Sequence, residues 1–171
     1  MLYDKTDKYS IEKYAQKLVG KTFNDICRED LDDKIVIESE NTYVLAHGDK
    51  KRKGGLGELV EERFFHYKAN SDSSPDFEEA GVELKVTPYK INKNKSISAK
   101  ERLVLTMIDY NSVIDEKEFD SSHFWYKSQW LLLVYYLWEK EIKDRLDYRI
   151  DYARLFTPSE EDLEVIRNDY F

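Results

Sequence analysis

The sequence predicts a single α/β domain in which a central β-sheet is flanked by helices. Residues 10–19 and 56–68 each carry apolar side chains at helical spacing, which indicates two amphipathic helices. Residues 82–87 alternate apolar and polar side chains, the pattern typical of a strand with one face in a core. Residues 130–138 are continuously apolar and predict a buried strand. At 171 residues, the chain has the length of one domain.

The N-terminal part contains the two predicted helices. Ser10 is the predicted N-cap of the helix over 10–19, and Gly20 is expected to end it. The glycines within 54–57 form a flexible entry into the helix over 56–68. The predicted buried stripe of that helix consists of Leu56, Leu59, Val60, Phe64 and Tyr67.

The middle of the chain is predicted to supply two paired strands. Residues 76–87 are expected to be extended, with a turn near 80–81. Pro88 is predicted to stop this strand, because proline has no N–H to donate to a sheet ladder. Residues 90–100 are then expected to form a polar, basic loop. Residues 102–110 are apolar and β-prone, and they predict a strand that pairs with the first.

The C-terminal part predicts one further strand and a final helix. Residues 146–156 alternate weakly, as a strand does. Thr157 is the predicted N-cap of the last helix, with Pro158 at the first helical position. The expected buried stripe of that helix is Leu163, Ile166 and Tyr170.

Composition excludes several classes of protein. Hydrophobic residues make up 41% of the chain and aromatic residues 14%, which is enough for a core and excludes general disorder. Cys27 is the single cysteine, so no internal disulfide forms. The start lacks the pattern of a signal peptide, and the apolar run over 130–138 is too short to span a bilayer. We expect a reduced, cytoplasmic protein with no membrane partner.

Charge is unevenly distributed, although the net charge is −8. Between Lys85 and Arg102 there are six basic residues and one acidic residue, and 50–53 is a second basic cluster. Two interpretations remain open for these lysines: solvated loop side chains, or a surface that faces phosphate groups.

Two carboxylates and a lysine form the motif that best indicates chemistry. Glu83 and Lys85 leave the same face of a strand, and Asp76 lies at the loop end of the same segment. Converging carboxylates are hard oxygen ligands suited to Mg²⁺, and such a metal stabilises a phosphodiester under attack by water. Lys85 would orient that water. The plain alternative is a surface strand with a Glu83–Lys85 ion pair.

Glu61 is a further candidate, because it lies at the margin of the apolar stripe over 56–68. A carboxylate there needs a partner or a metal, and a salt bridge to Arg63 or Lys68 would serve equally well. The sequence contains no zinc-ligand spacing, no G-x-S-x-G elbow and no phosphate-binding P-loop.

These residues resemble a known nuclease family. The string P-D at 75–76 followed by E-L-K at 83–85 resembles the PD-(D/E)XK signature. The wider stretch 53–61 resembles MutH, the strand-nicking endonuclease of mismatch repair, and the related restriction enzymes that cut at GATC. Residues 100–105 are most similar to the type II restriction branch, and 122–127 resembles the family's S-H-x-x-x-K segment.

The resemblance implies a restriction-endonuclease-like core, with a central mixed β-sheet flanked by helices, that uses Mg²⁺ and acts on double-stranded DNA. The catalytic set that it implies is Asp76, Glu83, Lys85, Glu61 and Lys127. The implied metal ligands are Asp76, Glu83, Leu84 and Glu61. The implied DNA contacts are Lys53, Gly54, Lys100 and Arg102. Without the resemblance, Lys127 would be read as an ordinary surface lysine.

The resemblance also implies that family members continue beyond the last predicted helix, with the loop that reads base edges. We therefore expect residues 1–171 to be one nuclease domain, truncated at its base-recognition end, with the missing portion as a partner and the oligomeric state open. Three functions compete: restriction at GATC, strand nicking in mismatch repair, and DNA binding without catalysis. The intact Asp76, Glu83 and Lys85 disfavour the third.

Overall fold

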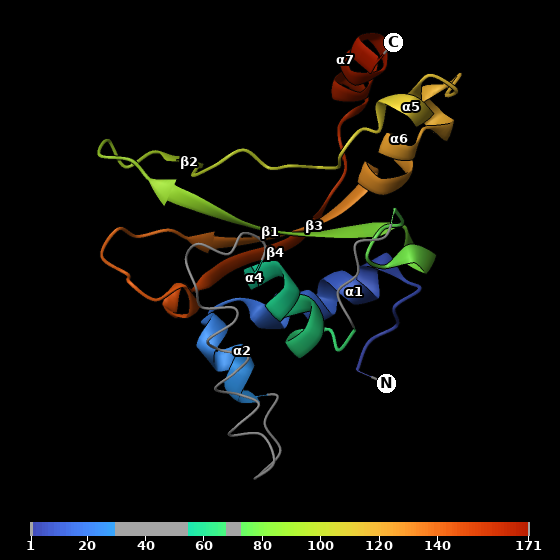
Figure 1. The fold of residues 1–171 in the computed structure, drawn as a ribbon. Coiled ribbons are helices and arrows are strands. Elements are labelled where there is room, and N and C mark those ends of the chain that lie inside the picture. Colours follow the sequence, from blue (N-terminus) through green and yellow to red (C-terminus); the bar gives the residue numbers. More distant parts are fainter. Residues whose placement is uncertain (1, 30–54, 68–72, 171) are drawn as a thin grey trace.

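The computed structural model describes residues 2–29, 55–67 and 73–170. Within these residues, the centre is a mixed sheet with the strand order β2-β1-β3-β4 (Figure 1). The strands are β1 (Val82–Ile91), β2 (Ile97–Ala99), β3 (Trp130–Leu137) and β4 (Ile150–Phe156). The central strands β1 and β3 are parallel, and the outer strands pair antiparallel to them. The predicted α/β architecture is confirmed.

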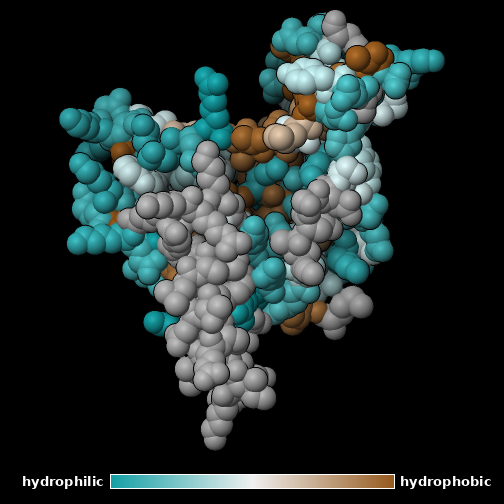
Figure 2. Space-filling view, in the orientation of Figure 1, coloured by the Kyte–Doolittle hydropathy of each residue, from teal (hydrophilic) through white to brown (hydrophobic). Residues whose placement is uncertain are grey.

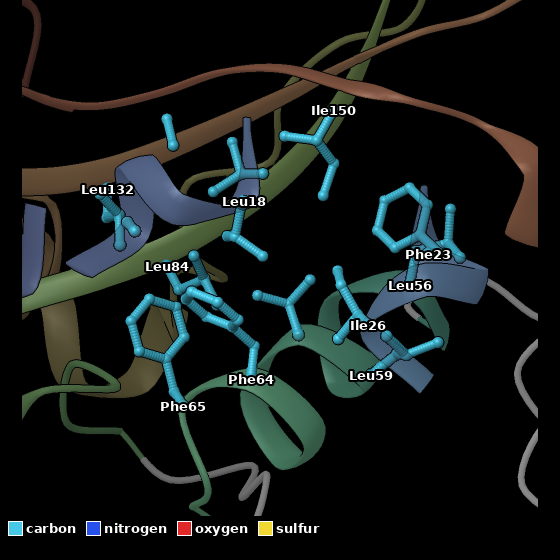
Figure 3. Packing of buried hydrophobic residues seen from close by; sticks show 14 of the residues in the cluster. Leu18, Phe23, Ile26, Leu56, Leu59, Phe64, Phe65, Leu84, Leu132 and Ile150 are labelled. Carbon is cyan, nitrogen blue, oxygen red and sulfur yellow. The ribbon is translucent and has the colours of Figure 1, made fainter. Parts of the chain in front are cut away.

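One face of the sheet is covered by the N-terminal helices. They are α1 (Lys8–Ala15), the 3-10 turn η1 (Gln16–Leu18), α2 (Phe23–Glu29), α4 (Gly55–Leu59) and its π-helical continuation η2 (Val60–Phe64). Leu132 and Ile150 of the sheet pack in one core with Leu18, Ile26 and Leu59 of the helices (Figure 3). None of the described helices is long and apolar enough to cross a bilayer.

The opposite face of the sheet is largely open. The helices α5 (Tyr110–Val113), α6 (His123–Ser128) and α7 (Glu160–Tyr170) lie together at one end of it, with the 3-10 turn η4 (Phe119–Ser121) (Figure 1). Leu133, Tyr135 and Phe156 line two adjoining hollows of ≈ 580 and ≈ 280 Å³ on this face. Figure 2 shows hydrophobic residues in this hollowed region. Two short 3-10 turns, η3 (Glu78–Ala80) and η5 (Arg145–Asp147), complete the fold.

The first predicted helix is confirmed, but its predicted cap is wrong. The helix starts at Lys8, because the Asp7 carboxylate accepts a hydrogen bond from the Tyr9 N–H at 3.0 Å. The Ser10 hydroxyl instead accepts a hydrogen bond from the Asp4 N–H. Gly20 follows the helix with φ of +90°, a conformation that favours glycine.

The cap predicted for the last helix is also wrong. Helix α7 begins at Glu160 rather than at Pro158, and the Ser159 hydroxyl accepts a hydrogen bond from the Asp162 N–H at 3.2 Å. Thr157 therefore belongs to the connection after β4. The helix predicted over 56–68 is confirmed as α4 and η2, whereas α2 was not predicted from the sequence.

Pro88 lies inside β1, so the prediction that it ends the strand is wrong. The Pro88 carbonyl accepts a hydrogen bond from the Lys100 N–H, whereas the Tyr89 carbonyl accepts from the N–H of Trp138, the residue after β3. Because the N–H and C=O positions of a strand residue share one side, the missing donor of Pro88 faces the β2 side. The parallel ladder between β1 and β3 therefore loses no hydrogen bond.

Two predictions for the segment after Pro88 are also wrong. Residues 90–100 contain the end of β1, a turn closed by the Asn92 N–H on the Ser96 carbonyl at 2.8 Å, and β2. Residues 102–109 form no strand, and the segment that pairs with β1 is β2, which meets it at Tyr89–Ile91. Instead, Leu103 and Leu105 line the smaller hollow over the open face. The strands predicted over 130–138 and 146–156 are confirmed as β3 and β4.

Candidate active site

A closed loop before β1 explains the spacing between the two predicted carboxylates. The Phe77 N–H donates to the Val82 carbonyl at 2.9 Å, and the Val82 N–H donates back at 3.2 Å. The turn η3 and Gly81, with φ of +64°, reverse the chain between them. In this antiparallel register, the next pair outward is Asp76 opposite Glu83. Six intervening residues therefore place the two carboxylates side by side.

Main-chain hydrogen bonds hold both carboxylates in place. The Asp76 Oδ2 accepts a hydrogen bond from the Leu84 N–H at 2.8 Å, and the Glu83 Oε2 accepts from the Asp76 N–H at 3.3 Å. Since the N–H and C=O of one strand residue point to the same edge, the Leu84 carbonyl faces the edge where Asp76 lies. In the described part of the chain, no strand pairs with this edge of β1 before Tyr89.

Two lysines approach Glu83 from different elements. The Lys85 Nζ lies 2.9 Å from the Glu83 Oε1, and the Lys127 Nζ lies 3.7 Å from the same oxygen. Lys127 belongs to α6, whose buried cap Ser122 accepts a hydrogen bond from the Trp125 N–H. Glu83 is only 4% exposed, so its ion pair with Lys85 is not that of a surface strand. The plain alternative for this pair is wrong.

Three carboxylates, Asp76, Glu83 and Glu61, act on one another electrostatically at this site. Burial and the Glu83 charge raise the pKa of Asp76 to about 6, against the Leu84 hydrogen bond and the two lysines, which lower it. Burial, Asp76, Glu58 and Glu83 raise the pKa of Glu61 to about 7. Glu61 lies on η2, and the structure brings it within the electrostatic reach of the pair. Such mutual repulsion is relieved when a cation lies between the carboxylates.

The donors fit a magnesium ion better than a metal with many protein ligands. Among residues 2–29, 55–67 and 73–170, no three His, Cys, Asp or Glu side chains form a ready-made metal group. Mg²⁺ is usually bound by one or two carboxylates and keeps several waters. Asp76, Glu83 and the Leu84 carbonyl are groups that could hold it, and Glu61 interacts electrostatically with both carboxylates.

Among the described residues, the predicted DNA contact Lys100 lies away from this site. The Lys100 Nζ lies 4.6 Å from the centre of the Trp138 ring, and the Lys100 N–H bonds to Pro88, five residues along β1 from Glu83. At strand geometry, this is about 16 Å from the carboxylates. Arg102 is exposed beyond β2. Lys53 and Gly54 lie outside the described residues.

One residue near the carboxylates was assigned only to the apolar stripe. Tyr67 lies three residues after the end of η2 at Phe64, and its phenol oxygen is buried without a hydrogen-bond partner. Asp76, Glu61 and Glu83 all act on it electrostatically. The sequence offered one signal: the last residue of the predicted apolar stripe is a tyrosine, which carries a hydroxyl, rather than a phenylalanine.

The mixed sheet with two carboxylates and a lysine at the start of a central strand is a restriction-endonuclease-like core. The family described as DNA mismatch repair enzyme MutH matches residues 65–169, which is more than half of the chain. The chain belongs to this family. The match includes Asp76, Glu83, Lys85 and Lys127, and Glu61 precedes it.

A restriction enzyme is among the similar proteins. The type II restriction enzyme Sau3AI of Staphylococcus aureus is 46% identical to this chain over 87 residues. The similar part makes up 51% of this chain and 17% of that enzyme, so the chain spans a small part of its relative.

Proposed function

We propose that this chain is the nuclease part of a type II restriction enzyme that hydrolyses phosphodiester bonds of double-stranded DNA with Mg²⁺. The observation that carries the proposal is the pair of carboxylates of Asp76 and Glu83, which main-chain hydrogen bonds hold beside Lys85. An ion pair between Glu83 and Lys85 needs only one carboxylate. Burying Asp76 beside Glu83 adds repulsion between two negative charges, which does not stabilise the fold. The similarity to Sau3AI supports the restriction class.

Each residue of the site has a proposed task. Asp76, Glu83 and the Leu84 carbonyl would hold the metal, which when bound would supply positive charge to a phosphodiester under attack by water. The Lys85 ammonium, fixed by Glu83, orients that water and favours the loss of its proton. Lys127 lies 3.7 Å from the same Glu83 oxygen and is proposed to bind a phosphate oxygen. Glu61 orients waters around the metal.

Cleavage at GATC is part of the proposal and depends on the likeness to GATC-cutting restriction relatives. Reading a base pair requires side-chain donors and acceptors at the groove edges, typically Arg or Lys for guanine. Lys100 and Arg102, on the connection from β2, are proposed as phosphate contacts outside the chemical site.

Supercoiled plasmid DNA with Mg²⁺ tests the proposal. Linear fragments that end at GATC support restriction, and nicked circles support the mismatch-repair activity that the family's description favours. DNA that is retarded but uncut would mean a binding module and would overturn the enzymatic proposal. Asp76→Asn is the matched control, since it keeps the shape of the side chain and removes its charge. A nuclease contaminant would survive this substitution.

A further inference from the structure

Three buried side-chain atoms in the described residues lack a hydrogen-bond partner: the Tyr67 hydroxyl, the Ser128 hydroxyl and the Arg167 Nε. Arg167 is otherwise engaged, because its Nη2 donates to Asp120. Ser128 lines the smaller apolar hollow, with no charged side chain among the lining residues. Tyr67 differs from both, because three acidic residues of the candidate site act electrostatically on its hydroxyl.

The ring of Tyr67 is held between the two segments that carry the acidic residues. Its main-chain N–H donates to the Glu61 carbonyl at 3.2 Å. Its ring packs edge-on against Phe77 at 5.3 Å between centroids, and Phe77 directly follows Asp76. A second ring, Phe65, lies 6.4 Å from the Tyr67 ring and 5.1 Å from the Phe77 ring, so the three rings form one cluster. The hydroxyl is therefore placed by packing, without any hydrogen bond of its own.

The surroundings keep this hydroxyl a donor. Burial is the largest cause that raises the pKa of Tyr67, and Asp76, Glu61 and Glu83 raise it further, so the phenol stays protonated. A buried donor without an acceptor is destabilising, and phenylalanine would fill the same space without that penalty. A partner that arrives with the functional state would remove the penalty.

A water molecule fits this position better than a phosphate oxygen does. The charges of Asp76, Glu61 and Glu83 all act on the hydroxyl, so an anionic ligand beside it would be repelled. A water molecule can donate both of its protons to carboxylates and accept the tyrosine proton on a lone pair. Mg²⁺ keeps several such waters when one or two carboxylates bind it.

We propose that Tyr67 is a positioning residue, whose hydroxyl donates a hydrogen bond to a water of the metal ion held at Asp76 and Glu83. This inference rests on the proposed function. Hydrogen-bonding partners outside the direct ligands typically change metal affinity or activity by about 10–100-fold.

Tyr67→Phe tests the inference, with Mg²⁺ binding measured by calorimetry and thermal unfolding measured in EDTA. We expect Mg²⁺ affinity to fall by about 10–100-fold, while the unfolding midpoint of the metal-free protein stays equal or rises. The matched control is Tyr3→Phe, because the Tyr3 hydroxyl donates to the Phe65 carbonyl at 3.0 Å. It should lower the midpoint and leave Mg²⁺ affinity unchanged.

Two outcomes overturn the inference, and they are distinguishable from failure of the proposed function. If Tyr67→Phe binds Mg²⁺ as tightly as the wild type, Tyr67 does not position a metal water. If it lowers the midpoint as Tyr3→Phe does, its hydroxyl has a structural partner instead. A wild-type protein that shows no more Mg²⁺ binding than Asp76→Asn would overturn the metal site itself.

Discussion

The two faces of the sheet differ in what they contribute. The helix-covered face buries Val82, Leu132 and Val134 completely, with 0% exposure. On the open face, Glu83 and Lys85 lie beside Leu131 and Leu133 in the parallel register of β1 and β3. Stability is therefore built on one face, whereas charge and chemistry occupy the other. A single strand serves both, because successive side chains point to opposite faces.

The difference also appears along the edge of β1. Near its start, the Leu84 N–H bonds to Asp76 rather than to a neighbouring strand, and β2 joins the sheet only at Tyr89. An edge without a strand leaves main-chain groups for ligands. The candidate site thus lies on the open face of the sheet, beside the part of the β1 edge that no described strand covers.

The largest expected effect comes from the open face. Asp76→Asn should lower cleavage by about 10³-fold or more, because it removes a charge that faces the metal and the developing negative charge. The unfolding midpoint should stay equal or rise, since the repulsion between Asp76 and Glu83 is lost. Single-turnover cleavage and thermal unfolding measure the two effects. Wild-type cleavage by the variant would disprove the assignment of Asp76.

The next prediction compares neighbouring residues on opposite faces of β3. Leu132→Ala should lower the free energy of unfolding by about 2–5 kcal/mol, since the side chain is fully buried. Leu133→Ala, half-buried on the open face, should cost roughly 1 kcal/mol. Urea unfolding monitored by circular dichroism gives both values. Equal losses would mean that the open face is covered in solution.

A smaller effect is expected from pH. The pKa values of Asp76 and Glu61 are raised to about 6 and about 7 from ordinary values of 3.8 and 4.5. The folded protein thus binds these protons more tightly than the unfolded chain, so stability falls as pH rises through this window. In EDTA, the unfolding midpoint should be higher at about pH 5 than at about pH 8.

Two additions separate this effect from other titrating groups. Asp76→Asn should reduce the dependence on pH, because it removes one of the two raised carboxyls. Adding Mg²⁺ at the higher pH should raise the unfolding midpoint of the wild type and leave that of Asp76→Asn unchanged. A midpoint that rises steadily with pH in EDTA would contradict the acidic character of the site.

The smallest effect is expected at the far end of β1. Lys100→Ala should weaken binding to all DNA sequences alike and reduce the salt slope of binding by about 1. The cleavage rate at saturating enzyme should not change, because Lys100 lies beside Trp138 and away from the carboxylates. Fluorescence anisotropy at several salt concentrations measures the slope. A change restricted to GATC duplexes would make Lys100 a base contact instead.

Local patterns in the sequence predicted the elements whose signals are periodic. The strand at 82–87 and the helix at 56–68 were predicted because one face of each is apolar, and β3 was predicted because its residues are continuously apolar. Helix starts were less well predicted, since Asp7 and Ser159 were as eligible as Ser10 and Thr157. A cap depends on which side chain meets the free N–H groups, and several neighbouring residues qualify.

The residues of the candidate site also differ in how far the sequence predicted their arrangement. The shared face of Glu83 and Lys85 follows from the period of a strand, and Asp76 follows from the resemblance and its spacing. The approach of Lys127 and Glu61 required the tertiary structure, because α6 and η2 are far apart in sequence. The unpartnered hydroxyl of Tyr67 could not be predicted, since only packing decides where a buried hydroxyl points.

By itself, the sequence determined that a strand carries an acid and a lysine on one face and a core on the other. It also determined the six-residue interval that lets the Phe77–Val82 bridge set Asp76 opposite Glu83. Only the tertiary structure decided that Pro88 continues the strand, since a missing N–H matters only on the side where a ladder runs. The open face was likewise decided there, because whether an apolar side chain is covered depends on elements distant in the chain.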